Sequence, residues 1–268
     1  MTAKSAPFTE ALFSSVHVAV LAALPSEVRP FLWRRQAQRL KQTSLPLWLF
    51  TMTPFQGLLG LTGPGCEAAA TKARFLCDCC RPRLLISCGF GGALTPALSP
   101  GDLVWGKRCY FYHPASHTLT PTPLASLKSA PYSLLTEQLN SVGLPAFPGT
   151  FISTPTVIAK APHRPFLAHL PYPVLDLETA AVAAVAAEHG LPFLSLRVIT
   201  DGADEEIPEF IAQAVAAGQS PGLRQALFWL LADPTRLLLL FRLWRRAEHA
   251  ARRLSLALEM VIPLAGQF

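Results

Sequence analysis

Charged residues are scarce in this chain of 268 residues, because Asp, Glu, Lys and Arg make up only 15% of it, whereas 51% is hydrophobic. Disordered chains have the opposite composition, so we expect a folded, well-buried globule. Long unbroken hydrophobic runs are missing as well. Residues 42–66 contain no charge, yet Pro46, Pro54 and Gln56 interrupt them, and a transmembrane helix needs about 20 consecutive apolar residues. The sequence therefore predicts no membrane span.

Features of a secreted protein are also lacking. The first ten residues are polar and do not have the pattern of a signal peptide. The six cysteines include the cluster Cys77, Cys79 and Cys80, but a second ligand pair at the spacing of a structural zinc site does not accompany it. We interpret the cluster as reduced thiols on a buried helix. We therefore expect a cytoplasmic protein without a metal or other cofactor.

Short apolar runs alternate with helical segments along most of the chain. This alternation predicts an α/β fold, with a mixed, largely parallel twisted sheet flanked by helices in one domain over residues 1–220. Residues 114–150 are rich in Pro, Ser and Thr and favour surface loops around one helix. The expected strands cover residues 18–23, 47–53, 56–62, 84–88, 150–153, 174–177 and 193–199, and the expected helices cover residues 67–80 and 179–189.

Three acidic residues follow the ends of expected buried strands. Glu27 follows the first strand, Glu178 follows strand 174–177, and Asp201 follows strand 193–199. Ligands of open α/β sheets bind at these strand ends. Cleavage of a purine N-glycosidic bond needs a proton for the leaving base, a contact to the ribose and a nucleophile on the opposite face. Carboxyl groups can serve all three needs when their surroundings set different protonation states.

Each of these features also has a simpler structural interpretation. Asp201 could cap the next helix, and Glu178 could stabilise a helix start through the helix dipole. The segment Gly89–Gly92, expected as a turn that ends strand 84–88, is too short for a dinucleotide-binding motif and is a weak indication of phosphate binding. Catalysis is favoured because the acids occur together with two longer motifs.

These motifs resemble the nucleoside phosphorylase superfamily over about residues 16–210. L-E-T-A-A-V-A at residues 177–183 and I-T-D-G-A-D at residues 199–204 are similar to the M-E-x-x-A-x-A and S-D-x-A-D motifs of that family. The most similar branches are the methylthioadenosine/S-adenosylhomocysteine nucleosidases and the hopanoid-associated phosphorylases. The resemblance implies cleavage of a purine nucleoside of adenosine type, by an enzyme that forms homo-oligomers.

The resemblance also implies a role for each site residue. Asp201 matches the aspartate that handles N7 of the base, Glu178 the glutamate that holds the ribose hydroxyls, and Glu27 the glutamate that activates water. Leu177 stands where the family has methionine. The remaining expected substrate contacts are Gly89, Phe90, Val157 and Ile158, of which the last two match positions beside the base.

The nucleophile stays open between water and phosphate at this point. Ser87 and Phe90 stand where hexameric phosphorylases place an arginine and a serine that bind phosphate, so water is favoured. Arg29 could supply a different contact to an anion, because the hopanoid-associated branch also has an arginine there. Two alternatives are a phosphate-dependent phosphorylase, with phosphate as co-substrate, and a non-catalytic nucleoside-binding or scaffold protein.

The C-terminal extension, residues 221–268, carries most of the net charge of +6. Residues 223–258 hold seven arginines against Asp233 and Glu248, so the body is nearly neutral and we expect no nucleic-acid partner. Two helical stretches are expected, separated at Asp233-Pro234. Arg242 and Arg246 recur on one side of the second helix, which is typical of a helix at a membrane surface. Packing on the domain or on a second subunit is an equally good interpretation. A lipid on the 5′ end of the adenosine, as in hopanoid synthesis, would suit this basic segment.

Overall fold

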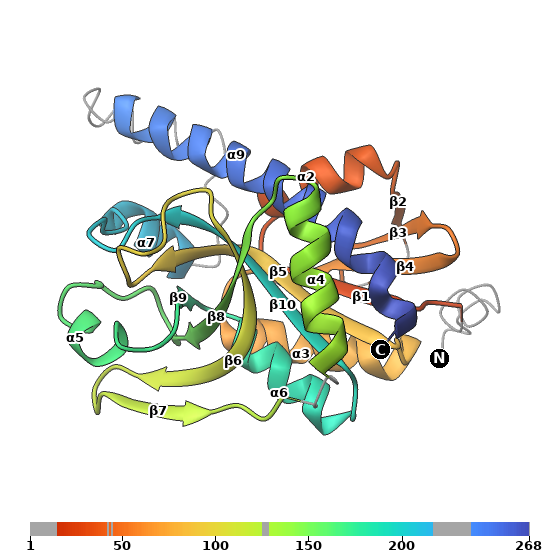
Figure 1. The fold of residues 1–268 in the computed structure, drawn as a ribbon, viewed down its shortest axis with the longest axis horizontal. Coiled ribbons are helices and arrows are strands. Elements are labelled where there is room, and N and C mark those ends of the chain that lie inside the picture. The colour runs from red at the N-terminus through yellow and green to blue at the C-terminus, as the bar shows by residue number, and fades with distance from the viewer. Residues whose placement is uncertain (1–14, 42, 44, 125–128, 217–236, 268) are drawn as a thin grey trace, which may run out of the picture.

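The computed structural model describes residues 15–41, 43, 45–124, 129–216 and 237–267 (Figure 1). They form one ten-stranded mixed sheet with helices packed against it. The strands are β1 (Val18–Ala22), β2 (Gln38–Leu40), β3 (Leu47–Met52), β4 (Phe55–Leu61), β5 (Leu84–Ala93), β6 (Leu103–His113), β7 (Thr118–Pro121), β8 (Ala146–Ser153), β9 (Pro173–Asp176) and β10 (Phe193–Asp201). The helices are α2 (Pro25–Arg34), α3 (Cys66–Cys80), α4 (Ser129–Ser141), α5 (Arg164–Leu167), α6 (Thr179–Glu188), α7 (Glu209–Ala216), α9 (Leu237–Val261) and the 3-10 helix η2 (Ile262–Gln267).

Part of the sheet closes on itself. Strands β4, β1, β5 and β10 are parallel, and β10 also pairs with β6 in the antiparallel direction. Strands β6, β8 and β9 are parallel, and β9 pairs with β5 in the antiparallel direction. Strands β5, β10, β6, β8 and β9 thus form a ring, from which β1, β4, β3 and β2 extend as an open sheet. The α/β fold and the mixed sheet are confirmed, and the ring is a feature that local patterns do not encode.

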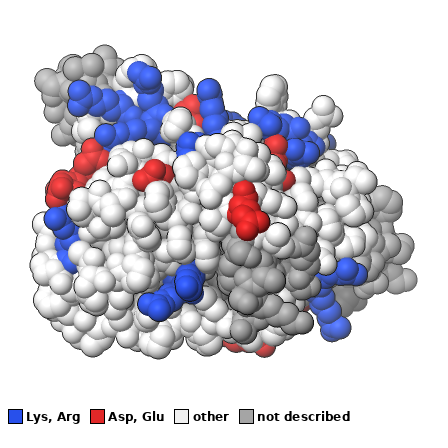
Figure 2. Space-filling model, in the orientation of Figure 1, with Lys and Arg blue, Asp and Glu red and all other residues white. Residues whose placement is uncertain are grey.

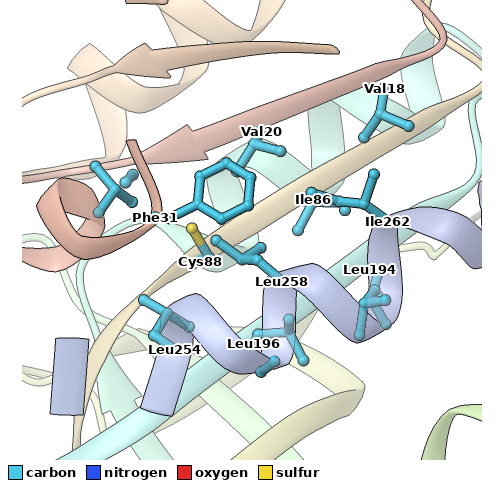
Figure 3. Close-up of a cluster of buried hydrophobic side chains, with 14 of the residues drawn as sticks. Val18, Val20, Phe31, Ile86, Cys88, Leu194, Leu196, Leu254, Leu258 and Ile262 are labelled. Carbon is cyan, nitrogen blue, oxygen red and sulfur yellow. The ribbon is translucent and has the colours of Figure 1, made fainter. Parts of the chain in front are cut away.

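The hydrophobic core lies on both faces of the open part of the sheet. Along β1, Val18 and Val20 face one side, whereas Ala19 and Leu21 face the other, as the period of two in a strand requires. Helices α3 and α6 cover the second side. Figure 3 shows the first side, where α2 and α9 place apolar side chains over β1, β5 and β10: Phe31, Leu254 and Leu258 among Val20, Cys88 and Leu196.

The two halves of α9 have different surroundings. Leu254, Leu258 and Val261 in the second half are fully buried, whereas Phe241 and Trp244 in the first half are about half exposed. The interpretation that the C-terminal extension packs on the domain therefore applies to the second half of α9. The expected break at Asp233-Pro234 lies outside the described residues. No helix in the described part of the chain is long and apolar enough to cross a membrane.

Two expectations about local structure are wrong. Gly89–Gly92 is not a turn, because β5 continues through these residues to Ala93 and stays paired with β10, with one shift of register between Ile199 and Asp201. Residues 114–150 are not only loops around a helix, since they also contain β7 and the first half of β8. The continuation of β5 depends on pairing with β10, which is distant in the sequence, whereas β7 pairs with β6, the strand directly before it.

Candidate active site

A cavity of about 220 Å³ lies where β1, β5, β9 and β10 end. It collects residues from segments that are far apart in the sequence. The expected site residues that line it are Glu27, Phe90, Val157, Ile158, Leu177, Glu178 and Asp201. Arg29 is not among the lining residues, because its side chain is 68% exposed and pairs with Glu248 at 3.2 Å. The other expected residue, Gly89, is not among the lining residues and lies against the carboxylate of Glu27.

Glu27 is held in the first turn of α2, directly after β1. Pro25 begins the helix, and the carboxylate of Glu27 accepts the backbone N–H groups of Leu24, at 2.8 Å, and Phe90, at 3.0 Å. Burial raises the pKa of the Glu27 carboxyl, although these hydrogen bonds and the charge of Arg197 oppose the rise. A Cβ atom at Gly89 would lie 2.7 Å from Oε1 of Glu27, so only glycine leaves room for this carboxylate.

Glu178 lies between β9 and α6, where it accepts the backbone N–H of Gly65 at 3.0 Å. Its carboxyl is enclosed by protein, and the negative charge of Asp176 is close by. Burial, and then Asp176, raise the pKa of Glu178 to about 8, although Arg197 opposes the rise. Glu178 therefore binds its proton much more tightly than an exposed glutamate does.

Arg197 is the cation at the centre of these acids, and the sequence reasoning did not assign it a role. It lies fully buried in β10, with Nε 3.0 Å from Oδ2 of Asp176 and Nη2 3.1 Å from Oγ of Ser87. Oε2 of Glu178 lies 4.0 Å from Nη2. A lone arginine within an apolar strand requires a buried acidic partner, and that signal could have identified it.

Asp201 ends β10 and forms an ion pair with the buried Lys160. Its Oδ1 accepts the hydroxyl of Thr200 at 2.8 Å, and the ammonium of Lys160 also donates to the carbonyl of Gly202 at 2.7 Å. A Cβ atom at Gly92 would lie 2.5 Å from Oδ2 of Asp201, so this glycine makes room for the pair. The sequence around Lys160 contains no motif that would have identified it.

The remaining wall of the cavity is largely apolar. Phe90, Val157, Ile158 and Leu177 contribute to it, together with Ile207 from the segment before α7. Apolar walls with a few convergent polar groups are typical of a site for a small organic molecule. Here the polar groups are carboxyls in different surroundings, which is the arrangement needed to donate a proton at one place and accept one at another.

Comparisons with known proteins identify the family and the fold. The profile of the Phosphorylase superfamily matches residues 17–221. The fold is similar to futalosine hydrolase of Helicobacter pylori, with a TM-score of 0.68 and 15% identity over 93% of this chain and 98% of that one.

The 5'-methylthioadenosine/S-adenosylhomocysteine nucleosidases of two bacteria are similar to the same degree. The Helicobacter pylori enzyme has a TM-score of 0.68 and 14% identity, covering 93% of this chain and 99% of that one. The Neisseria meningitidis enzyme has a TM-score of 0.67 and 16% identity, covering 92% and 98%. The profile match extends over most of the chain and includes all three acids, and the chain belongs to the Phosphorylase superfamily.

Proposed function

We propose that this protein hydrolyses the N-glycosidic bond of a purine nucleoside of adenosine type. The observation that carries the proposal is the convergence of Glu27, Glu178 and Asp201 on one cavity from three separate strand ends. Each acid has different partners, so each is suited to a different task. The nucleosidase names of the structural neighbours support the same reaction class.

In this mechanism Asp201 passes a proton to N7 of the base as the bond breaks, and the ammonium of Lys160, with which Asp201 is paired, can supply that proton. Glu178 holds the ribose hydroxyls and faces the positive charge that develops on the sugar. Glu27 accepts a proton from the attacking water, and a raised pKa suits a general base because it approaches the working pH. Val157 and Ile158 supply an apolar contact for the base.

Water is favoured over phosphate as the nucleophile because the cavity offers little positive charge. Among the described residues that line it, Lys160 is the only basic one, and its ammonium is engaged by Asp201 and the carbonyl of Gly202. A phosphate dianion would instead meet the carboxyls of Glu27 and Glu178. Arg29, the expected alternative contact for an anion, points away from the cavity toward Glu248.

The 5′ end of the nucleoside is proposed to carry an apolar substituent, such as the lipid of hopanoid synthesis. The apolar lining, with Phe90 and Ile207, supports this assignment, because a free 5′ hydroxyl would need a polar partner. A short soluble substituent would be accommodated by the same wall.

Release of free base from a panel of 5′-substituted adenosines, with and without phosphate, tests the proposal. We expect cleavage without phosphate and better turnover with apolar 5′ groups. Asp201→Asn should lower kcat by about 10²–10⁴-fold, the usual contribution of such a proton donor. The control is Asp204→Asn, an exposed aspartate of the same segment that should leave turnover intact. Strict dependence on phosphate would favour the phosphorylase alternative, and adenine binding without cleavage would favour a binding protein.

A further inference from the structure

Helices α2 and α9 lie against each other on one face of the sheet (Figure 1). Both helices expose aromatic side chains to solvent. Trp33 of α2 is 81% exposed, and Trp244 and Phe241 of α9 are 58% and 51% exposed. The rings of Phe241 and Trp244 lie 6.0 Å apart. Exposed apolar side chains that gather in one patch commonly mark a site of interaction with a partner.

Arginines surround these aromatic side chains. Figure 2 shows basic residues gathered along the upper edge of the molecule, over α9 and α2. Arg29 shares Glu248 with Arg252, whereas within the described residues no carboxylate pairs with Arg242 or Arg245. The guanidinium of Arg245 instead lies 5.9 Å from the ring centre of Phe241. We refer to these residues as the α2–α9 surface: Arg29, Trp33, Phe241, Arg242, Trp244 and Arg245.

We propose that the α2–α9 surface docks on an anionic phospholipid membrane. Aromatic rings favour the headgroup boundary, and arginines bind lipid phosphates there. The buried second half of α9 anchors the helix to the domain, so the first half is presented in a fixed orientation. Arg242 and Arg245 have no carboxylate partner within the described residues, and lipid phosphates would supply the complementary charge.

The α2–α9 surface is connected to the cavity at two places. Leu24 and Glu27, at the start of α2, line the cavity. Arg246 of α9 pairs with Glu205 at 2.8 Å, and Glu205 accepts the backbone N–H of Gly202 beside Asp201. If the proposed function holds, a docked protein would have its site close to the layer that holds a lipid-linked substrate. Docking itself does not depend on that function.

Co-sedimentation with vesicles tests the docking. We expect the full chain to bind vesicles of phosphatidylcholine and phosphatidylglycerol, to ignore phosphatidylcholine alone, and to be released by high salt because salt screens the charges. Each arginine near such a surface contributes about fivefold in affinity, so Arg242→Gln with Arg245→Gln should weaken binding by about 20-fold. Trp33→Ser should also weaken binding to the vesicles, and this result would show that α2 takes part in docking.

Two control variants isolate the contribution of the α2–α9 surface. Arg83→Gln removes an exposed arginine of another part of the molecule and should leave binding unchanged. Asp201→Asn should bind vesicles like the wild type, so failure of the catalytic proposal would not affect this result. The docking proposal is overturned if the wild type ignores phosphatidylglycerol vesicles at low salt, or if the surface variants bind as well as Arg83→Gln. It is also overturned if the variants change the oligomeric state instead, because a second copy of the chain would then cover the surface.

Discussion

Replacing Glu178 with glutamine is expected to change how the stability of the protein depends on pH. Burial and the neighbouring Asp176 raise the pKa of Glu178 from 4.5 to about 8. The unfolded chain loses this proton near pH 4.5, whereas the folded protein keeps it. The stabilisation is therefore fully present below about pH 4.5 and is lost as the pH rises through about 8. At about 1.4 kcal/mol per pKa unit, it amounts to on the order of 5 kcal/mol.

Urea denaturation at a series of pH values measures this effect. The glutamine of Glu178→Gln cannot ionise, yet its amide oxygen can still accept the N–H of Gly65. We expect the free energy of unfolding of the variant to rise above that of the wild type between about pH 5 and pH 8, and the difference to stay constant above that range. Glu137→Gln, which changes an exposed carboxylate on α4, should show no such trend. Parallel curves for the wild type and Glu178→Gln would refute the assignment of a buried, protonated Glu178.

Three further outcomes follow from the contacts in the cavity. Gly89→Ala should lower kcat/KM by on the order of 100-fold, because its methyl group displaces Glu27, and Gly202→Ala, which meets nothing closer than 3.6 Å, is the matched control. Equal activity of the two variants would contradict this. Lys160→Met should lower the free energy of unfolding in urea by about 3 kcal/mol, since it leaves a buried carboxylate without its cation. If Lys160→Met were as stable as the wild type, the ion pair between Lys160 and Asp201 would not stabilise the fold. Glu178→Gln should impair turnover of ribosides more than of 2′-deoxyribosides, and an equal loss in both assays would remove the proposed ribose contact.

The strands that carry the acids, and the helix after one of them, were predictable because their signals are local. Apolar runs mark β1, β9 and β10, and an Ala-rich segment marks α6. Each acid follows such a run directly, so its place at a strand end can be deduced without knowledge of the rest of the fold. Strands β1 and β10 both run parallel to β5, so Glu27 and Asp201 reach the same edge of the sheet. Glu178 arrives there on β9, which pairs with β5 in the antiparallel direction, and this part of the convergence depends on the ring of strands.

The partners of these acids were not predictable in the same way. Lys160 reaches Asp201 across 41 residues, and Arg197 reaches Ser87 across 110, so local sequence does not indicate either contact. The run Gly89–Gly92 favours a turn by composition, because glycine is common in turns. In the structure these glycines belong to a strand, and two of them lack side chains because carboxylates lie against the backbone.

The charge balance of the cavity suits a reaction in which the substrate becomes a cation. Arg197 is paired most closely with Asp176, while Glu27 and Glu178 have raised pKa values and hold their protons more tightly than exposed acids do. As the glycosidic bond breaks, the ribose gains positive charge, and a nearby positive charge favours the ionised form of a carboxyl. A carboxylate beside the ribose attracts the oxocarbenium character of the sugar, and burial strengthens this attraction. In the proposed mechanism such a site would stabilise the transition state more than the bound nucleoside, which is the condition for catalysis. A second arginine among these acids would pair with them before the bond breaks, and it would weaken their attraction for the positive charge on the sugar.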